Sequence, residues 1–129
     1  MRYLSCKEIY DAIKEWGIKE TNTREYAYEF QLKNGQYIYV KRLLDTQKRN
    51  PEPSRLMIHP AFVVLKDDLQ ELENIEFNFA QQGNMNSAFA QFPKSSQSRC
   101  DENPTEYGIG VNFHDKRSLL KLIVFIESV

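Results

Sequence analysis

The chain contains few cysteines and no long apolar run, and these two scarcities exclude several kinds of protein. Its only cysteines, Cys6 and Cys100, are too few for a metal cluster or a disulfide framework. The longest apolar stretch, residues 119–126, is far too short to cross a bilayer. The charged residues 1–16 lack the apolar core of a signal peptide. We therefore expect a reduced, cytoplasmic protein that does not associate with membranes.

The sequence also lacks a basic excess and the short motifs of nucleotide and hydrolase sites. Lys and Arg number 17 against 18 Asp and Glu, which gives a net charge of −1. An autonomous, high-affinity binder of nucleic acid usually carries a clear positive excess. No P-loop, GxGxxG or GxSxG pattern occurs. We therefore predict no cofactor and no metal, and we favour a non-enzymatic protein over an enzyme.

The residues that are present indicate one folded domain that begins with a helix. The 129 residues are 41% hydrophobic and 27% charged, which suits a single core and argues against a disordered chain. Ser5 and Glu8 form an S-x-x-E capping box, and apolar residues then recur at helical spacing until Gly17. This pattern predicts a helix over residues 5–16.

A hairpin follows, because Asn34-Gly35 is the strongest short-range turn signal between two alternating segments. A two-residue turn there pairs the predicted strands 24–32 and 36–41 so that Phe30 lies opposite Tyr39. That register puts the aromatic side chains of both strands on one face. We expect the first helix to cover this aromatic face.

Three more strands and a second helix complete the predicted fold. Residues 56–58, 75–79 and 107–113 have extended patterns, and Asp115 can cap a helix over residues 116–127, whose wide apolar arc predicts packing on more than one side. Residues 80–106 are rich in Gln, Asn, Ser and Pro, and we expect Phe89 and Phe92 to pin this irregular stretch to the body. The predicted class is α+β: a single domain, 1–129, with a mostly antiparallel sheet flanked by an N-terminal and a C-terminal helix.

A basic arm, residues 41–55, separates two of the strands. Its five cations outnumber two acids and give it a local charge of +3, whereas residues 66–76 carry −4. Such a dipolar molecule favours an electrostatically steered protein partner over nucleic acid, since the acidic segment would repel a long phosphate backbone. The cations of the arm are Lys41, Arg42, Lys48, Arg49 and Arg55.

Short motifs spread along the chain resemble one known family. They are Tyr3-Leu4 and residues 37–42, 56–60, 92–93 and 107–109. In this order they resemble the YgaC-like proteins, small bacterial cytoplasmic proteins with a domain of unknown function. The resemblance implies a compact α+β domain and a bacterial origin, and it implies no activity. The chain departs from the family pattern in its longer arm and in a Gln/Asn-rich stretch near residues 81–90.

The polar residues at strand ends within these motifs are Arg42, His59 and Tyr107, and we expect them to line any site common to the family. Together with the cations of the arm they form the predicted binding set. No catalytic residue is assigned.

Three functions remain open from the sequence. The first is a protein-binding module, such as a toxin-neutralising immunity protein or a small regulatory partner. The second is a nucleic-acid-binding accessory protein that uses the basic arm and stacks bases on Tyr or Phe rings. The third is a small ribonuclease with His59 and His114 as general base and acid, and with Lys41 or Arg42 stabilising the phosphorane. We favour the first and leave the oligomeric state open.

Overall fold

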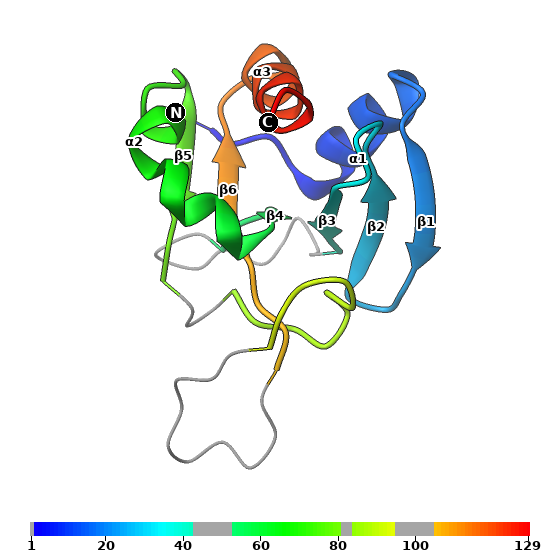
Figure 1. Ribbon diagram of the computed structural model, residues 1–129. Helices are drawn as coiled ribbons and strands as arrows, with labels where there is room; N and C mark the ends of the chain where they lie inside the picture. The colour runs from blue at the N-terminus through cyan, green and yellow to red at the C-terminus, as the bar shows by residue number, and fades with distance from the viewer. Residues whose placement is uncertain (1, 43–52, 81–83, 95–104) are drawn as a thin grey trace.

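A computed structural model describes residues 2–42, 53–80, 84–94 and 105–129 (Figure 1). It contains a six-stranded antiparallel sheet of order β1-β2-β3-β4-β6-β5. The predicted α+β class, with a helix at each end of the chain, is confirmed. The strands are β1 (Lys19–Thr23), β2 (Ala27–Gln31), β3 (Tyr37–Lys41), β4 (Leu56–Ile58), β5 (Ile75–Asn78) and β6 (Ile109–Phe113).

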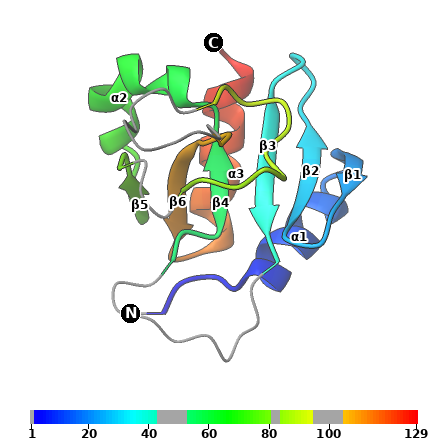
Figure 2. The same cartoon turned by 90° about the horizontal axis from the view of Figure 1, so that it is seen from below.

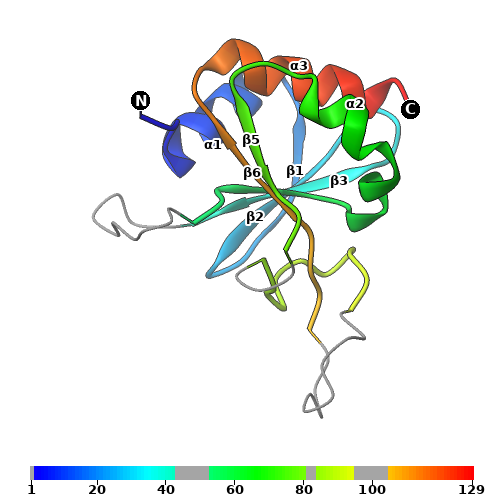
Figure 3. The same cartoon turned by 90° about the vertical axis from the view of Figure 1, so that its left-hand side faces the viewer.

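The helices lie on one face of the sheet (Figures 1 and 3). They are α1 (Cys6–Glu15), a 3-10 helix η1 (Pro60–Leu65), α2 (Lys66–Gln70) and α3 (Lys116–Glu127). The opposite face is crossed by the irregular segment 84–93, which lies in front of β3 and β4 in Figure 2. Among the described residues, no helix has the length and apolar character needed to cross a membrane.

Both terminal helices begin at the predicted caps. The Ser5 hydroxyl accepts from the Glu8 amide at 3.1 Å, and the Glu8 carboxylate accepts from the Ser5 amide at 3.0 Å, so the predicted capping box is confirmed. Gly17, at φ +76°, follows the end of α1. The Asp115 carboxylate accepts from the Ser118 amide at 2.7 Å and caps α3 as predicted.

The predicted register of the hairpin is wrong by one residue. Leu32 donates to the Gln36 carbonyl and accepts from the Gly35 amide, so the loop has three residues rather than two. Within loop 33–35, only Gly35 has a positive φ, +88°, whereas a two-residue type I′ turn needs positive φ at Asn34 as well. Phe30 therefore pairs with Ile38. A shift of one residue moves every side chain of β3 to the other face of the sheet.

This shift divides the aromatic side chains between the two faces. On the helix face, Phe30, Ile38 and Val40 join α1, α3 and β6 in the main apolar core. On the outer face, Tyr39 packs between β4 and segment 84–93, with the rings of Phe89 and Phe92 5.2 and 4.9 Å from its own. The prediction that one face carries all the rings is therefore wrong, and the prediction that Phe89 and Phe92 pin the irregular stretch is confirmed.

Two glycines allow segment 84–93 to lie close to the sheet. A methyl group on Gly108 would lie 2.8 Å from the Ile58 carbonyl oxygen. A methyl group on Gly110 would overlap the Ser54 side chain and lie 2.7 Å from Oδ1 of Asn84, which is buried. The outer face of β6 is thus bare at Gly110 because Ser54 and Asn84 occupy the space of a side chain there.

Candidate functional site

The structure gathers the described cations of the basic arm at one end of the sheet. The antiparallel pairing of β3 with β4 puts the Lys41 amide 2.8 Å from the Arg55 carbonyl oxygen. Arg42 follows Lys41 and donates its amide to the Tyr26 carbonyl in the turn between β1 and β2. We call this the cationic end of the sheet. Lys48 and Arg49 lie outside the described residues.

Arg42 is held in a fixed position at this end. Its Nη1 donates to the Arg24 carbonyl at 2.7 Å, and its guanidinium carbon lies 4.9 Å from the centre of the Tyr28 ring. The Tyr10 ring of α1 packs against Tyr28, with the ring centres 4.2 Å apart. A cation over an aromatic face is attracted by the ring quadrupole. These contacts orient the guanidinium before any ligand arrives.

Arg55 is also held, by contacts to Asn112 and Tyr3. Its amide donates to Oδ1 of the buried Asn112 at 3.1 Å, and its guanidinium lies 5.5 Å from the centre of the Tyr3 ring. The Tyr3 ring packs on His114 at 4.8 Å, and the phenol donates to Glu76. Glu76 also lies 3.2 Å from Nε2 of His114. This polar cluster anchors the start of β4 to the end of β6.

A pocket of about 550 Å³ opens between α1 and the strands β2 and β3. Cations outnumber acids in its wall, and Lys7 and Asp11 there form an ion pair at 2.8 Å. The Tyr10 phenol donates to Glu20 at 2.6 Å, which raises the pKa of Tyr10 to about 12 and keeps the ring neutral. The pocket is lined by Cys6, Lys7, Tyr10, Asp11, Glu25, Tyr28, Lys41 and Arg42.

A second pocket, of about 350 Å³, adjoins the same turn between β1 and β2. It is lined by Arg24, Glu25 and Tyr26 on one side and by residues 86–88 on the other. Tyr26 is 59% exposed, although an aromatic side chain of this size is usually more covered. Glu25 belongs to the walls of both pockets. The exposed Tyr26 ring therefore lines the second pocket with Arg24, and its backbone carbonyl holds Arg42, which lines the first.

His59 and Tyr107 lie at the opposite end of the sheet from Arg42. Ile58 pairs with Ile109 at the end of β4 that is farthest from Arg55. His59 follows Ile58, and Tyr107 lies two residues before Ile109, so both lie at this end. Five residues of β3 separate Arg42 from that end, or about 17 Å of strand. The structure thus brings Arg42, Lys41 and Arg55 together and separates them from His59 and Tyr107.

His59 has a structural partner for one ring nitrogen. Its Nδ1 accepts from the Ala61 amide at 3.0 Å and caps η1, and its ring packs edge-on against Phe92 at 5.4 Å. Burial lowers the pKa of His59, so the ring is neutral at pH 7. The ring borders a mainly apolar pocket of about 310 Å³ with Phe62 and Val64.

The two histidines do not form a pair. His114 follows the C-terminal end of β6, whereas His59 follows the C-terminal end of β4, and these strands are antiparallel. About six residues of strand, roughly 20 Å, separate the two positions along the sheet. One phosphate cannot contact both rings in this fold. Among the described residues, no group of three or more His, Cys, Asp and Glu side chains is placed to hold a metal ion.

A scan of the sequence against protein-family models and a search of curated proteins both found no match. The cationic end is therefore interpreted from its own chemistry: oriented guanidinium groups, an exposed phenol ring, and two adjoining hollows.

Proposed function

We propose that this protein is a non-enzymatic binding module that holds an acidic segment of a partner protein at the cationic end of its sheet. The observation that carries the proposal is the exposed Tyr26 ring in the turn whose backbone carbonyls, at Arg24 and Tyr26, hold Arg42. Tyr and Arg are enriched among the residues that dominate protein interfaces. A tyrosine loses little conformational entropy on binding because it has only two side-chain torsions.

The fixed position of Arg42 supports a carboxylate ligand. Its contacts to the Arg24 carbonyl and the Tyr28 ring restrict the guanidinium, so that less entropy is lost when a carboxylate binds. Arg presents a planar fork that matches a carboxylate with two parallel hydrogen bonds. The adjoining hollows offer room for the residues on either side of that carboxylate.

The resemblance to YgaC-like proteins stays a prediction. It would place such a module in the bacterial cytoplasm, as an immunity protein or a small regulatory partner. The proposal for the cationic end does not depend on that origin.

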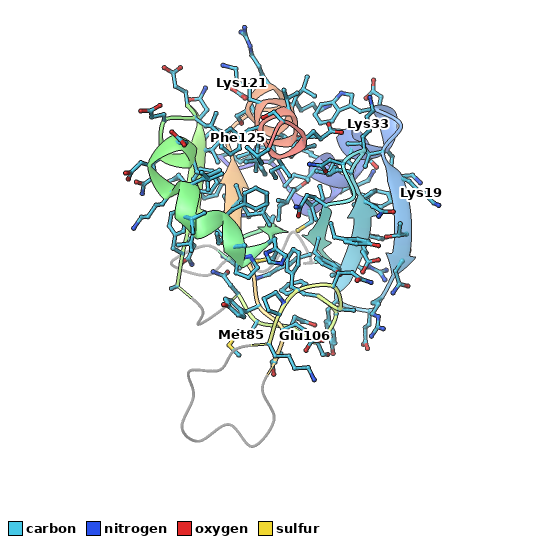
Figure 4. All side chains as sticks on the ribbon, viewed as in Figure 1. Lys19, Lys33, Met85, Glu106, Lys121 and Phe125 are labelled. Carbon is cyan, nitrogen blue, oxygen red and sulfur yellow. The ribbon has the colours of Figure 1, made fainter. Side chains whose placement is uncertain are left out.

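Affinity capture from a nuclease-treated bacterial lysate tests the proposal, with three variants of the full chain. Tyr26→Ala and Arg42→Glu should each weaken capture of a protein partner by roughly tenfold or more, because each removes an anchoring side chain. Lys33→Glu is the matched control, since it removes an exposed cation from the hairpin loop at the far end of the sheet (Figure 4). Capture that is equal for all three variants would overturn the proposal.

Binding of nucleic acid is the second candidate, because the same cations suit phosphate and Tyr26 is exposed for stacking. Fluorescence anisotropy with a labelled oligoglutamate peptide and a labelled single-stranded RNA separates the two. Tighter RNA binding that falls steeply with salt, and that is lost in Arg42→Glu, would favour nucleic acid. A preference for the peptide would favour the protein partner.

A further inference from the structure

The outward side of α3 carries an apolar stripe that the described residues leave uncovered. The helix packs inward on β6 and α1, yet Leu120 is 42% and Val124 57% exposed. These two side chains line a groove of about 410 Å³ together with Phe125 and with Leu72, from the turn after α2. Figure 4 shows Phe125 on the side of α3 nearer α2 and Lys121 on its outer side. The groove is almost wholly apolar between two charged banks.

The two banks carry opposite charge. The α3 bank presents cations, and Arg117 and Lys121 border the groove itself. The α2 bank presents only acids after Lys66. Neither set forms an ion pair within the parts of the chain that the structure describes. The exposed cations are Lys116, Arg117 and Lys121, and the exposed acids are Asp67, Asp68, Glu71 and Glu73.

This arrangement leaves unfavourable energy that a partner can relieve. Asp67 and Asp68 lie four and three residues before Glu71, and like charges at these spacings repel on a helix surface. Arg117 and Lys121 repel in the same way on α3. A partner for the whole groove must supply an apolar centre, acids opposite α3 and cations opposite α2.

We propose that a second copy of this chain binds the groove and forms a two-fold symmetric dimer. A two-fold axis through Leu120 and Val124 places the α2 bank of each copy opposite the α3 bank of the other. An interface of this kind is isologous: the same patch meets itself, and each charge contact occurs twice. The chain therefore provides all three features that the groove requires. This inference concerns a different surface from the cationic end and does not rest on the proposed function.

Sedimentation velocity of the full chain, over a wide range of protein concentration, tests the dimer. The wild type should shift from monomer to dimer as concentration rises. Val124→Lys should raise the dissociation constant by roughly tenfold or more, since it buries a charge at the axis. The control is Val64→Lys, which changes an equally apolar residue, 83% exposed, on η1 away from the groove.

Two charge-reversed variants make the test specific for self-association. Variant one carries Arg117→Glu and Lys121→Glu, and variant two carries Asp68→Lys and Glu71→Lys. Each alone should be monomeric, because both copies of the charge contact become repulsive. A mixture of the two should dimerise, because every contact then joins opposite charges. The dimer should also weaken as salt is raised.

Three outcomes would overturn the inference. They are a wild type that stays monomeric at all concentrations, a dimer unaffected by Val124→Lys, and a mixture of the two reversed variants that fails to associate. Circular dichroism of each variant shows whether the fold is kept. A partner of another kind that binds the groove while the wild type stays monomeric would also count against the second copy.

Discussion

The two faces of the sheet bury their side chains by different means. On the helix face, α1 and α3 supply apolar side chains at regular spacing, and Ser118 is the one polar residue buried on these two helices. On the outer face, an irregular segment provides the cover, and its rings surround Tyr39. A carboxylate is buried there as well: Glu29 is 6% exposed and accepts from Tyr39 at 2.5 Å and from Thr21 at 2.7 Å.

This difference implies unequal contributions to the fold. The helix face joins elements from both ends of the chain, so its loss unfolds the whole domain. The outer layer depends on a few rings and hydrogen bonds, and it can open while the sheet and helices stay intact. We therefore expect the helix face to determine the free energy of global unfolding, and the outer face to determine how readily its covering layer opens locally.

The largest expected effect comes from comparing Phe30→Ala with Phe89→Ala. Both rings are fully buried. Phe30→Ala should cost about 3–5 kcal/mol of global stability, because the main core is left with a cavity. Phe89→Ala should cost clearly less, because segment 84–93 can detach instead of leaving the cavity empty. Urea unfolding measures both, and equal losses would show that the two layers form one cooperative unit.

A smaller effect is expected for Tyr39→Phe. The Tyr39 hydroxyl donates to Glu29 and accepts from the Gln91 amide at 2.9 Å, and burial raises the pKa of Tyr39. Its loss leaves the buried Glu29 side chain with one donor fewer and removes the acceptor of the Gln91 amide, at a cost of about 1–3 kcal/mol. Native-state hydrogen exchange should show faster exchange of the Gln91 amide, with little change in α1. Tyr37→Phe, in the same strand, is the control, and an equal effect there would contradict this explanation.

The smallest expected effect is a pH dependence of stability that differs between the two faces of the sheet. Burial lowers the pKa of His59, which packs on the outer-face ring of Phe92, so the folded protein favours neutral imidazole. The stabilisation is complete above the unfolded pKa of about 6.5 and is lost as the pH falls toward the folded value. As the pH is lowered from about 6.5, the thermal midpoint should therefore decrease slightly. His59→Gln should remove this pH dependence of the midpoint.

The helix face should respond only to stronger acid. Hydrogen bonds from Arg2 and Ser5 lower the pKa of Glu8 to about 2. The contribution of the capping box is thus present above the unfolded pKa, about 4.3, and is lost as the pH falls toward 2. Glu8→Gln should reduce the pH dependence of stability only in this lower pH range. A single transition shared by both variants would mean that the faces are not separable by pH.

The sequence predicted those parts of the fold that have local signals. The caps at Ser5 and Asp115 are contacts between residues three positions apart, and so their patterns are visible in the chain. The hairpin register was missed because Asn34-Gly35 is compatible with loops of two or three residues. Strand β1 was missed because Lys19–Thr23 is polar, and its extended form comes from pairing with β2.

The candidate site was only partly predictable for the same reason. Lys41, Arg42 and Arg55 meet at one end of the sheet because β3 and β4 follow one another in sequence and pair antiparallel. Arg24 and Tyr26 reach that end through the register of β2 with β3, which no local pattern specifies. Arg42, His59 and Tyr107 do not converge as expected. Arg42 follows β3 and His59 follows β4, and because these strands are antiparallel their C-terminal ends lie at opposite ends of the sheet. Tyr107 precedes β6, which is antiparallel to β4, and so lies at the same end as His59.

The polar edge of the sheet has a consequence for how copies of the protein can associate. Among the described residues, β1 pairs with β2 alone, and its ladder is interrupted between Glu20 and Asn22. An edge that is short, bulged and charged is a poor template for adding another strand. Growth into open-ended fibrils by strand addition is therefore disfavoured at β1. The two-fold contact proposed through α3 would instead be complete with two copies, because each copy then has its patch occupied.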